Sequence, residues 1–146
     1  DISGVASVGF VGGDFYVDNN PGLANLEGLS GLSEVGGLFY VGYNSGLLDI
    51  DGLAKLQTVG ASLWIGENDA ITHVDGLTNL KKIEDALKIY GNDQLTDLSG
   101  LLSLQSVGGE LIILENGGLC QSYAETTAAS LPVAGALTIK DNKACE

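Results

Sequence analysis

The side chains that could carry chemistry in this sequence are a single histidine and the acidic residues around it. His73 is the only histidine of the chain, and polar residues recur at 24-residue intervals on both sides of it, first at Asn25, Asp49 and Asp97, then two positions later at Glu27, Asp51, Asp75 and Ser99. A histidine beside carboxylates can act as a general base or as a metal ligand. It can also simply offset the charge of its neighbours in an acidic row, and that is the role we expect for His73.

Other signs of catalysis are weak. The sequence contains no arginine, no GxSxG motif and no histidine–cysteine cluster with metal-ligand spacing. A polysaccharide-cleaving enzyme would need paired carboxylates in a groove, and an ice-binding surface would need a regular threonine ladder. Asp49, Asp51 and Asp75 could attract Ca²⁺, but they form no tight oxygen cage in the sequence pattern. We therefore expect no catalytic residue, no cofactor and no metal site.

Charge narrows the range of partners. The 146-residue chain has 19 acidic residues against 6 lysines, which gives a net charge of −13. Nucleic acids and anionic membrane surfaces attract basic patches, so both are disfavoured as partners. No apolar run approaches the ~20 residues that a membrane-spanning helix needs. The length suits one domain, and we expect residues 1–146 to form it.

A 24-residue repeat organises almost the whole sequence. Its clearest column is asparagine, at Asn20, Asn44, Asn68, Asn92, Asn116 and, after a spacing of 26, Asn142. Apolar columns accompany it, so that one repeat reads LxIxxNxxLxxLxGLxxLxxV. Self-similarity at a fixed period is typical of a solenoid, in which each turn buries its apolar positions against the next. A buried carboxamide at each corner can satisfy backbone donors and acceptors, and stacked asparagines can bond to one another.

The pattern predicts a mainly β fold, a parallel β-solenoid of about 24 residues per turn with a short C-terminal capping helix. Alternating apolar residues before each asparagine indicate half-buried strands. The later leucines recur every third residue, which suits short strands, corners or 3₁₀ turns. We expect residues 1–11 to form a partial first turn, 12–119 regular turns, and 120–146 a helix cap and last turn. The cap helix is expected over residues 122–131, ended by Pro132.

The two cysteines fall in this terminal region. Cys120 lies four residues after Asn116, and Cys145 lies three residues after Asn142. If the turns stack, the two positions are adjacent and could form a disulfide, which would indicate an oxidising, extracytoplasmic setting. The alternative is two reduced, buried thiols.

The outward positions of the predicted strands suggest where a ligand could bind. The residue between the two buried positions of each strand is Tyr16, Tyr40, Trp64, Lys88, Ile112 and Thr138 in turn, and Tyr43 and Tyr90 lie beside this row. Exposed aromatic stripes often mark contact sites. We take the candidate ligand-binding set to be Tyr16, Tyr40, Tyr43, Trp64, Lys88 and Tyr90. The alternative is cross-strand pairing that only stabilises the sheet.

The repeats also resemble a known family. The stretch LKIYGNDQLTDLSGLLSLQSVGGELIILENGGLC, with its NGGLC ending at Asn116–Cys120, is similar to the receptor L domains. These leucine-rich solenoids occur in insulin-receptor and epidermal-growth-factor-receptor ectodomains and in microbial surface proteins. The similarity covers about residues 5–145. The tryptophan and further cysteines that usually follow the LC ending in the animal receptors are missing, so no growth-factor ligand is implied.

The resemblance implies a right-handed, non-catalytic recognition or adhesion module that is secreted or displayed on a cell surface. Its partner would be an extracellular protein or a glycan. The alternative is a structural spacer in a larger surface protein. The partial first turn leaves an unpaired edge near the N-terminus, and we expect that edge to need a cap, a neighbouring domain or self-association with a second copy.

Overall fold

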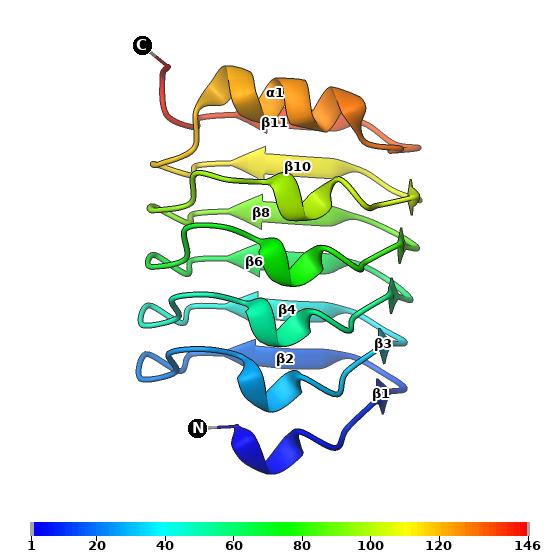
Figure 1. Cartoon of the computed structure of the whole chain (residues 1–146). Coiled ribbons are helices and arrows are strands. Elements are labelled where there is room, and N and C mark those ends of the chain that lie inside the picture. Colours follow the sequence, from blue (N-terminus) through cyan, green and yellow to red (C-terminus); the bar gives the residue numbers. More distant parts are fainter. Residues whose placement is uncertain (1, 146) are drawn as a thin grey trace.

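The computed structural model describes residues 2–145 and consists of stacked turns of parallel strands (Figure 1). One sheet has six strands in the order β11-β10-β8-β6-β4-β2. Their bounds are Leu137–Lys140, Leu111–Leu114, Leu87–Tyr90, Leu63–Gly66, Phe39–Gly42 and Phe15–Asp18. All neighbouring strands in this sheet are parallel. This confirms a mainly parallel β architecture, which is compatible with a β-solenoid.

A second, narrower parallel sheet runs along one edge of the stack (Figure 1). Its five two-residue strands are β1 Phe10–Val11, β3 Glu34–Val35, β5 Thr58–Val59, β7 Lys82–Ile83 and β9 Ser106–Val107. Five 3₁₀ helices form a third row, at Ser3–Val5, Glu27–Leu29, Asp51–Leu53, Asp75–Leu77 and Ser99–Leu101. The three-residue spacing of the leucines thus corresponds to 3₁₀ turns, one of the forms that the sequence predicted.

The 3₁₀ row explains the glycine of the repeat. Gly52, Gly76 and Gly100 each sit directly against the backbone of the preceding turn, where a side chain would collide with the carbonyl groups of Leu26, Ile50 and Val74. A glycine is needed here because no Cβ fits between the two backbones. This close approach lets the leucines on either side reach the core, where Leu53, Leu77 and Leu101 are fully buried.

The core is a single column of aliphatic side chains inside the turns. Inward-pointing residues of the six-stranded sheet, among them Phe39, Leu63 and Leu111, are fully buried together with the leucines of the 3₁₀ row. Phe15 and Phe39 stack with ring centroids 5.3 Å apart. Burial of apolar surface along the whole stack is the main stabilising contribution to such a repeat structure.

The helix α1, Gln121–Ser130, lies across the C-terminal end of the stack (Figure 1). It buries Ala124, Thr127 and Ala128, and Leu131 follows it into the core. The chain then returns as β11, which pairs with β10. The predicted cap helix is therefore present, one residue earlier than the sequence suggested at each end. Cys120 and Cys145 form the predicted disulfide, with Cα atoms 5.2 Å apart.

Candidate functional site

The outer face of the six-stranded sheet carries the aromatic row. Register pairs join Tyr16 to Tyr40, Tyr40 to Trp64 and Trp64 to Lys88, so these four side chains occupy adjacent strands β2, β4, β6 and β8. Each lies between two inward-pointing residues of its strand, because successive side chains of a strand alternate between faces. The alternation in the sequence therefore identifies the face on which these residues lie.

The rings of the row touch edge to face. Tyr16 and Tyr40 have ring centroids 6.2 Å apart at an interplanar angle of 78°, and Tyr40 and Trp64 repeat the same geometry. Edge-to-face pairs of this kind are favourable because the positive edge of one ring meets the negative face of the next. The Nζ atom of Lys88 lies 4.8 Å from the centroid of the Trp64 ring, in a cation–π contact.

Two glycines on this face, which sequence reasoning missed, lie beneath tyrosine rings. Gly42 and Gly66 follow the aromatic row by two residues, and a side chain at either would collide with the ring of Tyr40 or Tyr90, respectively. The rings of the two tyrosines thus lie directly against the backbone at these glycines, and their hydroxyl groups are 3.5 Å apart. Burial, aided by the hydrogen bond with Tyr90, raises the pKa of the Tyr40 hydroxyl well above its ordinary value. The signal for this contact in the sequence was a glycine at the same outward position of two neighbouring strands, β4 and β6.

Trp64 has an unusual polar environment. Its indole Nε1 is buried, and no described residue accepts a hydrogen bond from it. Burying an N–H group without a partner costs about 1–3 kcal/mol. This cost is opposed by the contacts of the indole ring, which are the edge-to-face pair with Tyr40 and the cation–π contact with Lys88.

Tyr43 lies apart from the ring contacts, at the corner that follows β4. It adopts a left-handed backbone conformation with φ of 53° and is half exposed. It borders a shallow hollow of about 350 Å³ that is also lined by Asn19, Pro21, Ser45, Glu67 and Asp69. The structure thus brings Tyr16, Tyr40, Trp64, Lys88 and Tyr90 into one cluster, called the aromatic cluster below, and places Tyr43 at its margin.

The acidic columns around His73 have a local structural role. Asn25, Asp49 and Asp97 each accept a hydrogen bond through Oδ1 from the backbone N–H two residues later, at the start of a 3₁₀ helix. These are side-chain caps of the kind that asparagine and aspartate favour. The N–H of Ser99 lowers the pKa of Asp97, with partial burial opposing it and a hydrogen bond from the Tyr123 hydroxyl adding to the lowering.

His73 occupies the same column but makes different contacts. Its main chain bridges to Asp97, whereas its Nδ1 lies 3.9 Å from Asp51 and 3.5 Å from Asp75. His73 thus neighbours Asp97 of the next turn, as the acidic row predicted, and its charge also contributes to the lowered pKa of Asp97. Asp51 and Asp75 are further neighbours of its side chain. Among residues 2–145, no three histidine, cysteine or acidic side chains come together as a metal site.

The asparagine column forms a continuous hydrogen-bonded row. The Oδ1 atoms of Asn44, Asn68, Asn92, Asn116 and Asn142 each accept from the backbone N–H of the asparagine one turn earlier. Their Nδ2 groups donate to backbone carbonyls of the preceding turn, such as Val17 and Val41. Four of these side chains, from Asn44 to Asn116, are fully buried, and the row satisfies corner groups that would otherwise lack partners.

Gln121 continues the row beyond its last asparagine, a role that sequence reasoning missed. Its Oε1 accepts from both the N–H and the Nδ2 of Asn142, at 3.3 and 3.0 Å. Its Nε2 donates to the carbonyl of Ile139 at 2.8 Å. These are the bonds that a further asparagine one turn later would make, so the first residue of α1 completes the ladder. Gln121 is outside the 24-residue register, and the sequence holds no repeat signal for it.

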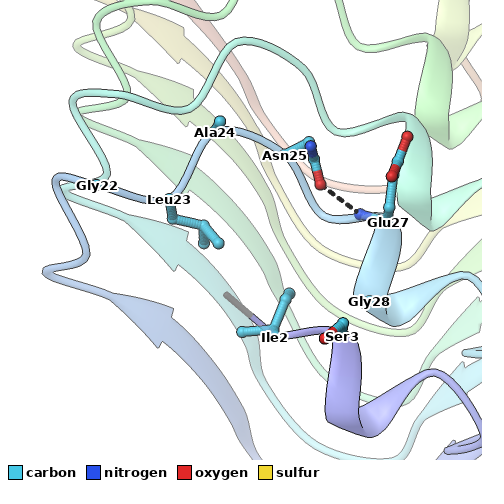
Figure 2. Close-up of a pocket in the computed structure, with 8 residues that line it drawn as sticks. All are labelled: Ile2, Ser3, Gly22, Leu23, Ala24, Asn25, Glu27 and Gly28. Carbon is cyan, nitrogen blue, oxygen red and sulfur yellow. Dashed lines mark hydrogen bonds between the residues drawn. The ribbon is translucent and has the colours of Figure 1, made fainter.

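The opposite end of the stack is more open. A hollow of about 300 Å³ lies between the first 3₁₀ helix and the corner at Gly22–Asn25, and Ile2 and Leu23 point toward each other across it (Figure 2). Ser3, Glu27 and Gly28 complete its lining. Its walls hold no acid–base pair, because Glu27 is exposed and Asn25 is occupied in capping.

The described part of the chain contains no helix with the length and apolar character of a membrane span. Comparison of the chain with protein-family models, with curated proteins and with solved structures found no match. The geometry of the aromatic cluster is therefore the basis for a functional assignment.

Proposed function

We propose that this chain is a non-catalytic recognition or adhesion module that binds an extracellular protein or glycan through the outer face of its six-stranded sheet. The contact residues are Tyr16, Tyr40, Trp64, Lys88 and Tyr90, with Tyr43 at the margin. The observation that carries the proposal is the continuous aromatic cluster on an outward sheet face, since aromatic residues are favoured at the centre of binding interfaces.

The finer details of the fold are also part of this proposal. A right-handed parallel β-solenoid of the receptor L type, with about 24 residues per turn, would present the aromatic face as a rigid surface. Register partners such as Phe15 and Phe39, and the regular spacing of the asparagines, support that description. The disulfide between Cys120 and Cys145 supports a secreted or cell-surface location, because such bonds persist in oxidising compartments.

The second candidate function is a structural spacer in a larger surface protein. It is favoured by the contacts within the cluster itself, because each ring of the row already packs against its neighbour. In that case the aromatic residues would only stabilise the sheet, and any ligand would bind elsewhere.

A binding experiment separates the two functions. The only tryptophan of the chain lies in the cluster, so its fluorescence reports on the proposed site directly. The folded domain would be titrated with neutral oligosaccharides and with extracellular proteins, alongside a Tyr16→Ala/Tyr40→Ala variant. Leu48→Ala and Leu102→Ala provide controls, because both leucines are exposed apolar residues outside this sheet.

A saturable fluorescence change that the two leucine controls retain and the double tyrosine variant loses would support recognition through this face. Equal behaviour of all variants toward every ligand, with circular dichroism showing intact folding, would instead support the spacer.

A further inference from the structure

The aromatic cluster already holds one cation. Lys88 places its Nζ over the Trp64 ring at 4.8 Å, and the carboxylate of Glu110 lies 3.6 Å from the same Nζ. A ring face combined with a nearby carboxylate is an arrangement that stabilises an ammonium or guanidinium group. Lys88 thus shows, within the chain itself, how this surface can hold a cationic side chain.

The surroundings of the cluster are acidic. Asp14 accepts a 3.5 Å hydrogen bond from the Tyr16 hydroxyl, and Asp18 follows on the same face of β2. Glu67 extends its carboxylate over Gly91, beside Tyr90. Of the six lysines in the sequence, only Lys88 and Lys140 lie in strands of this sheet, and Lys140 is paired with Asp141. With a net charge of −13 behind it, this face complements a basic partner.

The spacing of the rings suits an extended chain. Neighbouring centroids along the row are 6.2 Å apart. Alternate residues of an extended segment are about 6.7 Å apart and point to the same side. A segment that crosses the strands with basic residues at alternate positions can therefore place one cationic side chain at each successive ring.

A glycan fits this geometry less well. Sugar rings stack on flat, open aromatic faces, whereas adjacent rings here meet at 78° and the face of Trp64 is covered by Lys88. The Lys88 side chain shows that an aliphatic stem ending in a charge can lie over a ring of this row, which is the contact expected of a lysine or arginine side chain.

We propose that the aromatic cluster and its carboxylate rim, Asp14, Asp18, Glu67 and Glu110, bind an extended segment of a partner protein that carries lysine or arginine at alternate positions. This inference rests on the proposed recognition function and names its partner class. Lys88 acts in it as an internal competitor, because it occupies the Trp64 face that an incoming cation would use.

The test measures peptide binding by isothermal titration calorimetry at low salt, with Trp64 fluorescence as a second readout. All peptides have uncharged, chemically blocked termini. The probe alternates lysine and glycine over eight residues. One control peptide has the same composition with its four lysines in a single block, and a second replaces lysine by glutamate. We expect the alternating peptide to bind more tightly than the block peptide, and the glutamate peptide not to bind.

Matched variants separate the site from general attraction between opposite charges. Asp18→Asn/Glu67→Gln removes two charges at the rim, and Asp51→Asn/Asp75→Asn removes two from the 3₁₀ row. We expect only the rim pair to weaken binding strongly. Tyr40→Ala should weaken it about two- to five-fold, as expected for the loss of one exposed cation–π contact.

Lys88 provides the most distinctive comparison. Lys88→Gln should tighten binding of the alternating peptide, because it frees the Trp64 face. Lys82→Gln is the control, because Lys82 lies in the other sheet and its replacement makes the same charge change without uncovering Trp64. Equal effects of the two lysine variants, or of the two carboxylate pairs, would overturn the proposal.

Neutral oligosaccharides complete the design. If cellohexaose or chitohexaose binds in a Tyr40-dependent way while the lysine peptides do not, the proposed recognition function survives and the inference about a basic partner fails. If neither peptide nor oligosaccharide alters Trp64 fluorescence in a folded domain, the inference about a basic partner fails, and the titration with extracellular proteins decides the recognition function.

Discussion

At the scale of single residues, the corner asparagines have the clearest physical role. Asn68 is fully buried and accepts from the backbone N–H and the Nδ2 of Asn44, while its own Nδ2 donates to the carbonyl of Val41. No smaller side chain can replace these bonds, because they need both a donor and an acceptor at one point. Substitution would leave buried polar groups unpaired on both sides.

We therefore predict that Asn68→Ala lowers the free energy of unfolding by about 3 kcal/mol. Urea unfolding followed by circular dichroism measures the change. Asn79→Ala is the matched control, because Asn79 is exposed and makes one bond to the carbonyl of Ala54. Equal losses for the two variants would show that burial within the ladder is not what makes Asn68 important.

Asp97 gives the fold a pH dependence of known sign. Its pKa is lower in the folded protein than the unfolded value of about 3.9, chiefly because the N–H of Ser99 donates to the carboxylate. The ionised carboxylate therefore contributes stability above the unfolded pKa, and this contribution is lost as the pH falls from there through the folded pKa.

We predict that Asp97→Asn reduces the loss of stability on acidification, since the asparagine keeps the cap without titrating. Asn25 shows that a carboxamide can cap the same position in another turn. Unfolding free energies at neutral and acidic pH measure the effect, with Asp69→Asn, an exposed corner carboxylate, as the control. An unchanged pH dependence in Asp97→Asn would contradict the assignment.

At the scale of elements, α1 is joined to the stack by polar contacts as well as by its apolar face. Gln121 completes the asparagine row, and the hydroxyl of Tyr123 donates to Asp97 while it accepts from the N–H of Leu98. The disulfide from Cys120 to Cys145 closes the same region. These polar contacts and the disulfide fix the orientation of the helix over the last turn. Its small buried alanines alone would fix that orientation less well.

We predict that Gln121→Ala destabilises the domain by about 2 kcal/mol, because it leaves Asn142 and the carbonyl of Ile139 with fewer partners in a partly buried setting. Hydrogen exchange should localise the loosening to α1 and β11. Gln94→Ala serves as the control at an exposed position. Unchanged exchange at Asn142 in Gln121→Ala would rule out this capping role.

The sequence predicted the elements well where they repeat and poorly where they do not. The asparagine, leucine and outward aromatic positions recur every 24 residues, so their common environment could be inferred from the pattern. Gln121 lies outside that register and satisfies the ladder from a helix, which no periodicity indicates. The contacts of Gly42 and Gly66 depend on the directions in which the rings of Tyr40 and Tyr90 lean, which side-chain packing decides.

At the scale of the whole molecule, the two ends of the stack differ. The C-terminal end is covered by α1, whereas the N-terminal end presents the edges of β1 and β2 and the exposed side chains of Val5 and Phe10 (Figure 1). Unpaired strand edges are templates for association. The same end is acidic, with Asp14, Asp18 and Glu27 near it, and no lysine precedes Lys55 in the sequence.

We predict that self-association through the N-terminal edge strengthens with salt. At about 20 mM salt the like charges repel, and at about 500 mM they are screened over a few ångströms. Sedimentation velocity would follow the monomer–dimer balance. Phe10→Ser should suppress association, whereas Leu102→Ser should not, although the two residues are 60% and 61% exposed. Association that weakens with salt would point to another contact.

The direction of the asparagine row has an electrical consequence. From Asn44 to Asn142, each Oδ1 accepts from the turn before it, so the side-chain amide dipoles align along the axis of the stack instead of alternating. Aligned hydrogen-bonded amides polarise one another. At the C-terminal end Gln121 terminates the series, and at the other end no residue from 2 to 145 donates to Oδ1 of Asn20. The asparagine row is thus a weak permanent dipole, with its negative pole toward the N-terminal end of the stack.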